Sequence, residues 1–176
     1  MLRAVPGDDD PAVVLFWDTS HLRGDRVDAT LRPFPGWEST AGWLLTRITP
    51  VPEPIVFDGD LEQLRATDFP VNDQGWPVMS RRMLAVLSGL GAFAHRAMPV
   101  SIVERRAKRR AEPLADRFVA VQLLEHVDAP DWSGALPPLF RLGASPEHLL
   151  ISRAARGALV AAGIRGAVYW SLATTT

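Results

Sequence analysis

The residues best suited to chemistry in this 176-residue chain are a short run of carboxylates and one histidine. Asp58, Asp60 and Glu62 alternate along the chain, so in an extended segment they share one face and could hold a divalent cation or act in hydrolysis. His126 and Asp128 share a strand face in the same way and could pair. We favour a solvated acidic loop and a hydrogen-bonded structural histidine, because neither group belongs to a recognised catalytic motif.

The usual nucleophile, nucleotide and metal motifs do not occur in the sequence. There are no cysteines, and the four histidines include no pair at the i, i+4 spacing of a helical metal site. Ser88 is not part of a G-x-S-x-G elbow, because Val86 stands two positions before it. Gly89 and Gly91 follow a predicted helix, whereas a dinucleotide-binding loop precedes one. We therefore expect no cofactor, no metal and no enzymatic activity.

Charge is spread unevenly, although the formal net charge is only −1. A solvated acidic segment can attract a basic partner and speed its association. The candidate partner-contacting residues, with the tryptophan as an interface anchor, are Asp58, Asp60, Glu62, Asp68, Asp73 and Trp76. A basic run follows later, from Arg105 to Arg110. Glutamates at 104 and 112 dilute this run and no aromatic residue interrupts it, so we favour a solvated face over nucleic-acid binding.

Two principal helices are expected, near 81–90 and 153–162. Ser80 and Ser152 stand at the N-cap positions. Met83, Leu84, Leu87 and Leu90 recur at helical spacing and predict a buried face for the first helix. The two serines are 72 positions apart (152 − 80 = 72), and the same shift relates leucines and glycines farther along both helices. We favour common helix punctuation over an internal duplication as the explanation.

Short apolar runs separated by turn residues predict strands around the two helices. These strands are expected at 12–17, 43–48, 55–57, 100–103, 117–127, 138–142, 149–151 and 167–170, with a short helix over 61–66 that Asp60 caps. Fifteen prolines argue against an all-helical bundle. The predicted fold class is α+β, with a mainly antiparallel sheet and two principal helices. Residues 1–67 are interpreted as a strand- and loop-rich region and 68–176 as an α+β region, together one compact unit.

Neither a membrane span nor a secretory signal is expected. The longest early apolar run, Ala12–Trp17, is far shorter than the roughly 20 residues that a membrane helix needs. Acidic residues at positions 8–10 interrupt the place where a signal peptide has its apolar region. We therefore expect a soluble cytoplasmic protein.

Several motifs between residues 68 and 170 resemble those of the myxobacterial-type immunity proteins of bacterial polymorphic toxin systems, a domain-of-unknown-function group. The motifs are Asp-Phe-Pro-Val (68–71), Pro-Val-Met-Ser-Arg-Arg-Met (77–83), Phe-Val-Ala-Val-Gln (118–122), Pro-Leu-Phe-Arg-Leu (138–142), Leu-Ile-Ser (150–152) and Ala-Ala-Gly-Ile-Arg-Gly-Ala-Val-Tyr-Trp (161–170). The resemblance implies a small α+β protein that binds a cognate toxin, for example a nuclease, and blocks it without catalysis. The alternatives are a small hydrolase that uses Asp58, Asp60 and His126, and a nucleic-acid-binding regulator that uses the 105–110 run.

Overall fold

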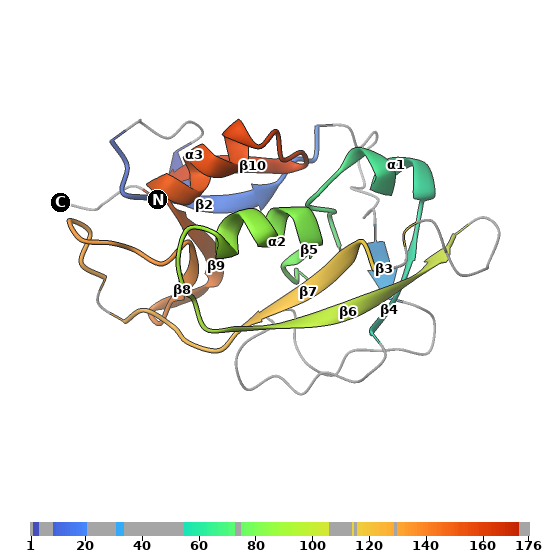
Figure 1. Ribbon diagram of the computed structural model, residues 1–176, viewed down its shortest axis with the longest axis horizontal. Helices are drawn as coiled ribbons and strands as arrows, with labels where there is room; N and C mark the ends of the chain where they lie inside the picture. Colours follow the sequence, from blue (N-terminus) through green and yellow to red (C-terminus); the bar gives the residue numbers. More distant parts are fainter. Residues whose placement is uncertain are drawn as a thin grey trace.

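The computed structural model describes residues 2–3, 9–20, 31–33, 55–72, 75–105, 114, 116–128 and 130–172. These residues form two five-stranded sheets and three helices (Figure 1). The first sheet has the order β1-β10-β2-β9-β8, with bounds Leu2–Arg3, Ala167–Leu172, Ala12–Trp17, Ser145–Ser152 and Leu139–Leu142. The second sheet has the order β3-β4-β6-β7-β5, with bounds Leu31–Pro33, Ile55–Gly59, His95–Glu104, Phe118–Leu123 and Val78–Ser80. The helices are α1 (Leu61–Ala66), α2 (Arg81–Ser88) and α3 (Arg153–Ala161).

The predicted α+β class is confirmed, and antiparallel pairing dominates both sheets. Every strand pair in the first sheet is antiparallel, and in the second sheet only β4 and β6 are parallel. The strands divide into two sheets, whereas the sequence predicted one. Strands from residues 1–67 lie in both sheets, beside strands from residues 68–176. The expected strand over 43–48 lies outside the described residues.

All three predicted helices are present, and each begins with the predicted cap. The Ser80 hydroxyl accepts a hydrogen bond from Met83 N, the Ser152 hydroxyl accepts one from Ala155 N, and the Asp60 carboxylate caps α1. These caps satisfy backbone N–H groups that have no partner inside the helix. Helix α2 ends at Ser88, two residues earlier than predicted. Leu90 therefore lies beyond the helix and is 44% exposed, so its predicted place on the buried face is wrong.

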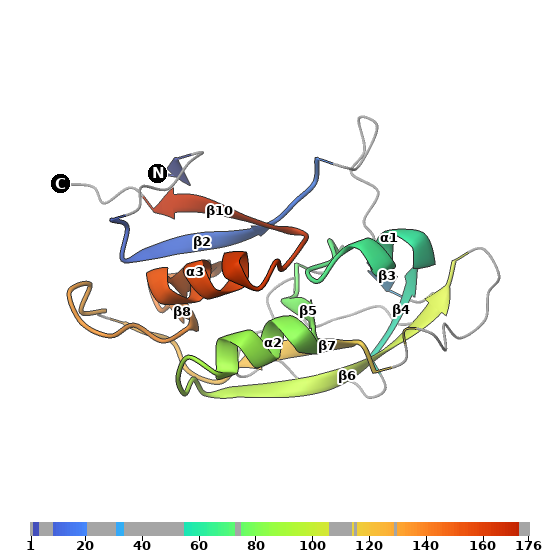
Figure 2. The same ribbon diagram turned by 45° about the horizontal axis from the view of Figure 1, so that its top comes forward.

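The main core lies where one face of each long helix packs against the two sheets. Figures 1 and 2 show α2 and α3 side by side, and in Figure 2 α3 lies next to β2 and α2 next to β7. Arg82 in the first turn of α2 donates to the carbonyl of Ala162, the C-cap of α3, so the two helices run antiparallel. The buried core residues come from both sheets and both helices: Val13, Leu15, Phe69, Met79, Met83, Leu87, Val119, Val121, Leu123, Leu139, Leu149, Ile151, Ala155 and Leu159.

The two long helices belong to two copies of one structural unit. In each copy a strand, a helix and a second strand follow one another, and a further strand pairs antiparallel between the two. The copies are β5-α2-β6 with β7 between the strands, and β9-α3-β10 with β2 between them. Residues of β9, α3 and β10 stand 72 positions after their counterparts in β5, α2 and β6 (150 − 78 and 167 − 95). Residues of the middle strand β7 stand 106 positions after their counterparts in β2 (120 − 14 and 123 − 17). The shifts carry the pair Val78–Ala120 onto Leu150–Val14 and the pair His95–Leu123 onto Ala167–Trp17.

Main-chain hydrogen bonds outside the sheets repeat as well. Arg81 N donates to Arg117 O over 2.9 Å, and its counterpart Arg153 N donates to Pro11 O over 2.9 Å. Helix punctuation alone does not account for this agreement, because strand register and strand-to-helix contacts lie outside the helices. The spacing seen in the sequence therefore reflects a structural repeat. The middle strand follows the unit in one copy and precedes it in the other, so the copies are permuted relative to each other.

None of the helices in the described part of the chain has the length and apolar character that crossing a membrane requires.

Candidate functional site

Two of the six predicted contact residues are buried, Asp58 in the second sheet and Trp76 in the core beside it. Asp58 in β4 is 8% exposed, and Arg105 Nε donates to its Oδ1 over 2.6 Å. Trp76 is fully buried, and its ring stands edge-on to Phe57 with the centroids 6.4 Å apart. The expectation of an exposed side chain is wrong for both residues. Asp58 supports the end of β6, and Trp76 fills the core between the sheet and α1, where Leu64 is also buried.

Asp68 is also enclosed, with 2% of its surface exposed. The Ser80 hydroxyl donates to its Oδ1 over 2.9 Å, and Arg165 N donates to its Oδ2 over 3.1 Å. Arg82 Nη1 lies 3.6 Å from Oδ2. One carboxylate therefore joins three segments, namely the chain before β5, the start of α2 and the turn between α3 and β10. The prediction of an exposed contact residue is wrong here because the helix cap and the turn close over the side chain.

Asp60 and Glu62 lie at the N-terminal end of α1. Asp60 Oδ1 accepts hydrogen bonds from Glu62 N and Gln63 N, over 2.9 and 3.3 Å. The Glu62 side chain is exposed. Beside them is a groove of about 200 Å³, lined by Asp60, Leu61, Glu62, Arg65 and Glu104. Asp73, the last of the six, lies outside the described residues. The predicted acidic surface is thus reduced to the first turn of α1 and the end of β6.

A larger groove of about 760 Å³ lies on the other side of α1. Its lining includes Asp18, Glu62, Gln63, Arg165 and Gly166. Gly166 has a φ of +86°, and a Cβ there would stand 1.9 Å from Thr67 Oγ1, so the turn packs directly on the segment after α1. We call the exposed residues of α1, together with these two grooves, the α1 face; the exposed residues of α1 are Glu62, Gln63, Arg65 and Ala66.

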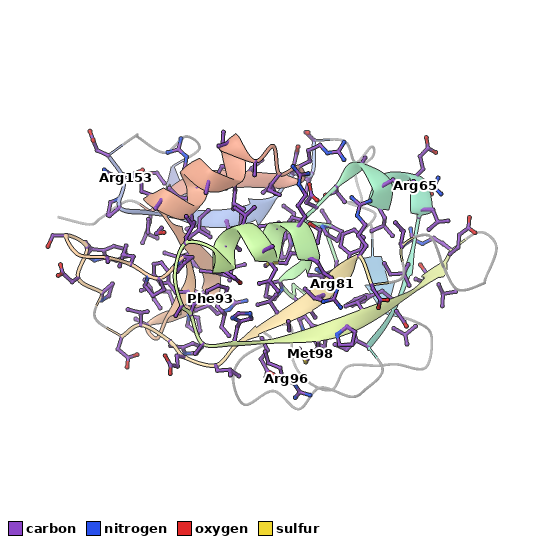
Figure 3. All side chains as sticks on the ribbon, in the orientation of Figure 1. Arg65, Arg81, Phe93, Arg96, Met98 and Arg153 are labelled. Carbon is purple, nitrogen blue, oxygen red and sulfur yellow. The ribbon has the colours of Figure 1, made fainter. Side chains whose placement is uncertain are left out.

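Five arginines gather at the C-terminal end of α1. Figure 1 shows this end meeting the N-terminal end of α2 and the turn between α3 and β10. Figure 3 labels Arg65 on α1 and Arg81 at the start of α2. We call the group the arginine cluster; it consists of Arg65, Arg81, Arg82, Arg117 and Arg165. All except Arg117 are exposed, and Arg117 is half-buried.

Backbone carbonyl oxygens hold most of these guanidinium groups. Arg117 Nη2 donates to Arg65 O and Thr67 O, over 3.4 and 3.1 Å, and Arg165 Nη2 donates to Arg65 O over 3.3 Å. Arg81 Nε donates to Asp116 O over 2.6 Å. Because Arg117 and Arg165 share one acceptor oxygen, their Nη2 atoms lie within about 7 Å of each other, where like charges repel. A cation near a helix C-terminus is favourable, which offsets part of this repulsion.

The sequence contained only one local sign of this cluster. Arg81 and Arg82 occupy the first turn of α2, the end where the helix dipole disfavours a positive charge. The structure explains Arg82, since its guanidinium reaches Asp68 and the C-terminal carbonyl of α3. The other three arginines are far apart in sequence, and only the packing of α1, β7 and the α3–β10 turn brings them together.

The residues of the alternative hydrolase site do not converge. Asp58 pairs with Val103 at one end of β6, while His126 follows Leu123, which pairs with His95 at the other end. Eight residues of strand separate these ends, about 26 Å. His126 instead lines a groove of about 430 Å³ with Phe93, Glu125, Phe140 and neighbouring residues. Its Nε2 is buried and has no hydrogen-bond partner among the described residues, so the predicted hydrogen-bonded role is wrong for that atom.

The basic run lies mostly outside the described residues. Arg105 is described, and it forms the ion pair with Asp58. Residues 106–110 are outside the described ranges, so the alternative of nucleic-acid binding through this run stays untested. Within the ranges that are described, no group of three or more His, Asp or Glu side chains is placed to hold a metal ion.

No protein-family model and no curated protein matches this chain.

Proposed function

We propose that this chain is an immunity protein that binds a cognate bacterial toxin in the cytoplasm and neutralises it by covering part of the toxin surface. The observation that carries the proposal is the separation of opposite charges between the start of the α1 face and the arginine cluster beside its end. Carboxylates of Asp60, Glu62 and Glu104 surround the start of α1, and the arginine cluster surrounds its end. Such a pattern favours a partner with the complementary arrangement and suppresses other partners.

The α1 face is anchored at both ends of the helix, which favours tight binding. Leu64 is fully buried beneath α1, and Asp60 caps the start of the helix. At the other end, Arg117 and Arg165 donate to main-chain carbonyls of residues 65 and 67. A surface held in this way loses little conformational freedom when a partner docks, so more of the contact energy contributes to affinity.

The area needed for such a complex is available. A stable protein complex buries about 800 Å² on each partner. The accessible surface of the chain is 9620 Å², so the interface would use about a twelfth of it. The α1 face, with grooves of about 200 and 760 Å³ on its two sides, also offers relief into which partner side chains can insert.

The motifs that carry the family resemblance support the class of function more than the position of the interface. They fall on the segment before β5, on β5 and α2, on β7, on β8 and β9, and on the end of α3 with β10. These elements form the repeated unit and its core, whereas α1 precedes the first motif. The resemblance therefore concerns the scaffold, and the α1 face is proposed from its charges and shape.

Co-expression tests the proposal directly. The chain is produced with the toxin encoded by the neighbouring gene, and the complex is measured by co-purification, biolayer interferometry and rescue of growth. We expect Glu62→Arg to weaken binding about tenfold, because it reverses a charge at the centre of the α1 face. Glu125→Arg is the matched control, an exposed glutamate after β7, near the His126 groove.

The proposal makes two separable claims about this experiment. If the product of no neighbouring gene binds the chain or is neutralised by it, the chain is not an immunity protein. If a toxin binds and Glu125→Arg weakens the complex more than Glu62→Arg does, the toxin uses another surface and the α1 face is the wrong site.

A further inference from the structure

The positive charge of the arginine cluster is largely uncompensated. Among the five arginines, only Arg82 has a carboxylate within 4 Å in the described part of the chain, namely Asp68. The guanidinium groups of Arg81, Arg117 and Arg165 are fixed by neutral carbonyl oxygens. A guanidinium has five N–H donors, and one or two are used here, so several donors on each remain for another acceptor.

The internal repeat shows which of these charges the architecture does not require. By the same shift of 72 residues, Ala154 in the second copy stands at the position of Arg82, and Phe93 in the first copy stands at the position of Arg165. Pro11 takes the place of Arg117, since its carbonyl accepts the hydrogen bond that starts α3. At each of these three positions, one of the two copies therefore forms the same structure with an uncharged residue. The repeated unit therefore does not require the cations at positions 82, 117 and 165, which the two copies contribute together.

Helix α1 has no counterpart in the second copy, and Arg117 and Arg165 do hold its C-terminal carbonyls. This anchoring accounts for part of the cluster. It does not account for Arg65, whose side chain is exposed and makes no hydrogen bond or ion pair within the described residues. A third cation beside two others raises the repulsion without adding a contact to the fold.

We propose that the arginine cluster is the docking point for a carboxylate-bearing loop of the protein partner, an inference that rests on the proposed function. Planar guanidinium groups fixed in space bind carboxylates through paired hydrogen bonds. The cluster is small and lies next to carboxylates of Asp18 and Glu62 in the adjoining groove. A short loop can present a single carboxylate to the cluster, whereas duplex DNA carries a charge about every 1.7 Å and would also meet these acidic side chains.

The test compares two arginines that occupy equivalent positions in the two copies. Arg81 Nε donates to Asp116 O, and Arg153 Nε donates to Asp10 O, so each side chain holds its own helix start in the same way. Arg153 lies toward the opposite end of the molecule from Arg65 (Figure 3). Arg81→Glu and Arg153→Glu should therefore have similar effects on folding, and only the first should affect docking on the cluster.

Binding of the neighbouring toxin is measured for wild type, Arg65→Glu, Arg81→Glu and Arg153→Glu at 50 and 300 mM salt. We expect the dissociation constant to rise about tenfold for Arg65→Glu and Arg81→Glu, and to stay within about twofold for Arg153→Glu. The rise should be smaller at the higher salt concentration, since salt screens exposed charges. Thermal unfolding of each variant checks that the fold is retained.

The outcomes separate this inference from the proposed function. If the toxin binds all four proteins equally well, the proposed function stands and the arginine cluster is not the docking point. If no neighbouring product binds wild type, the proposed function fails, and hexaglutamate and a short DNA duplex are titrated into wild type and Arg65→Glu. Hexaglutamate binding that Arg65→Glu abolishes would still support carboxylate docking. Tighter binding of the duplex, or no binding of hexaglutamate, would overturn it.

Discussion

Replacing Asp68 should destabilise the fold more than any other single carboxylate substitution described here. Asp68→Ala leaves the partly buried Arg165 N without its acceptor and removes the partner of the buried Ser80 hydroxyl. Each buried polar group that loses its partner costs about 1–3 kcal/mol. The ion pair with Arg82 adds less than about 1 kcal/mol, because that guanidinium is half-exposed and screened. We expect a loss of roughly 3–5 kcal/mol, a large part of the 5–15 kcal/mol typical of a domain.

Asp68→Asn separates hydrogen bonding from charge. The amide oxygen can still accept from Arg165 N, and the amide N–H can donate to the Ser80 hydroxyl oxygen, so both contacts survive with one donor reversed. We expect a cost of about 1–2 kcal/mol, well below that of alanine. The Ser80 hydroxyl also accepts from Met83 N, so the helix cap should persist in the asparagine variant.

Urea unfolding followed by tryptophan fluorescence measures these differences. Stability changes appear as shifts of the urea midpoint at constant slope. Glu62→Ala is the control, since that carboxylate is exposed and its loss should change the free energy of unfolding by less than about 0.5 kcal/mol. The reasoning is refuted if Asp68→Ala costs less than about 1 kcal/mol. It is also refuted if asparagine and alanine cost the same, because charge would then dominate over hydrogen bonding.

Three further changes probe other parts of the fold. Gly166→Ala should lower the free energy of unfolding in urea by roughly 2–4 kcal/mol, because Gly166 has a positive φ and an alanine Cβ would overlap Thr67 Oγ1. An unchanged free energy would show that the turn does not pack on Thr67. The pKa of Asp131 lies below its ordinary value of 3.8 because the Ser133 hydroxyl and N–H donate to the carboxylate. The carboxylate therefore stays charged further into acid. Ser133→Ala should raise that pKa in an NMR titration, and an unchanged value would contradict the contact. Arg141 is 2% exposed, and desolvation lowers its pKa to about 10. Arg141→Met should raise the free energy of unfolding by about 1 kcal/mol, seen as a higher urea midpoint. A lower midpoint would mean that the hydrogen bond to Pro146 O outweighs the cost of desolvation.

Local chemistry in the sequence predicted the helices well. A capping side chain bonds to N–H groups two or three residues away, so the start of each helix is decided within one turn. Ser80, Ser152 and Asp60 were all identified in this way, and the structure confirms each cap. The buried strand at 118–123 was also predicted, because a run of apolar β-forming residues reads as a central strand.

Strand pairing was harder to predict. The strand expected at 100–103 is the end of β6, which begins at His95 and includes Pro99. Residues 95–99 pair with β7 and residues 100–104 pair with β4, so the proline lies where the pairing passes from one neighbour to the other. A proline is tolerated there because it need not donate to a continuous ladder. The second sheet arises from this exchange of partners, which no local pattern encodes.

By itself, the sequence determined the α+β class, the helix starts and the spacing of 72 residues that proved to be a structural repeat. Only the tertiary structure decided which charges are buried and which are exposed. Asp58 and Asp68 resemble their exposed neighbours in sequence, yet long-range packing encloses them. Arg65, Arg117 and Arg165 are far apart in the chain, yet α1, β7 and the α3–β10 turn meet at one point and bring them together. The physical reason is the separation along the chain over which each effect acts. Caps and periodicity act within a few residues, whereas burial and charge clustering depend on contacts between segments up to about a hundred residues apart.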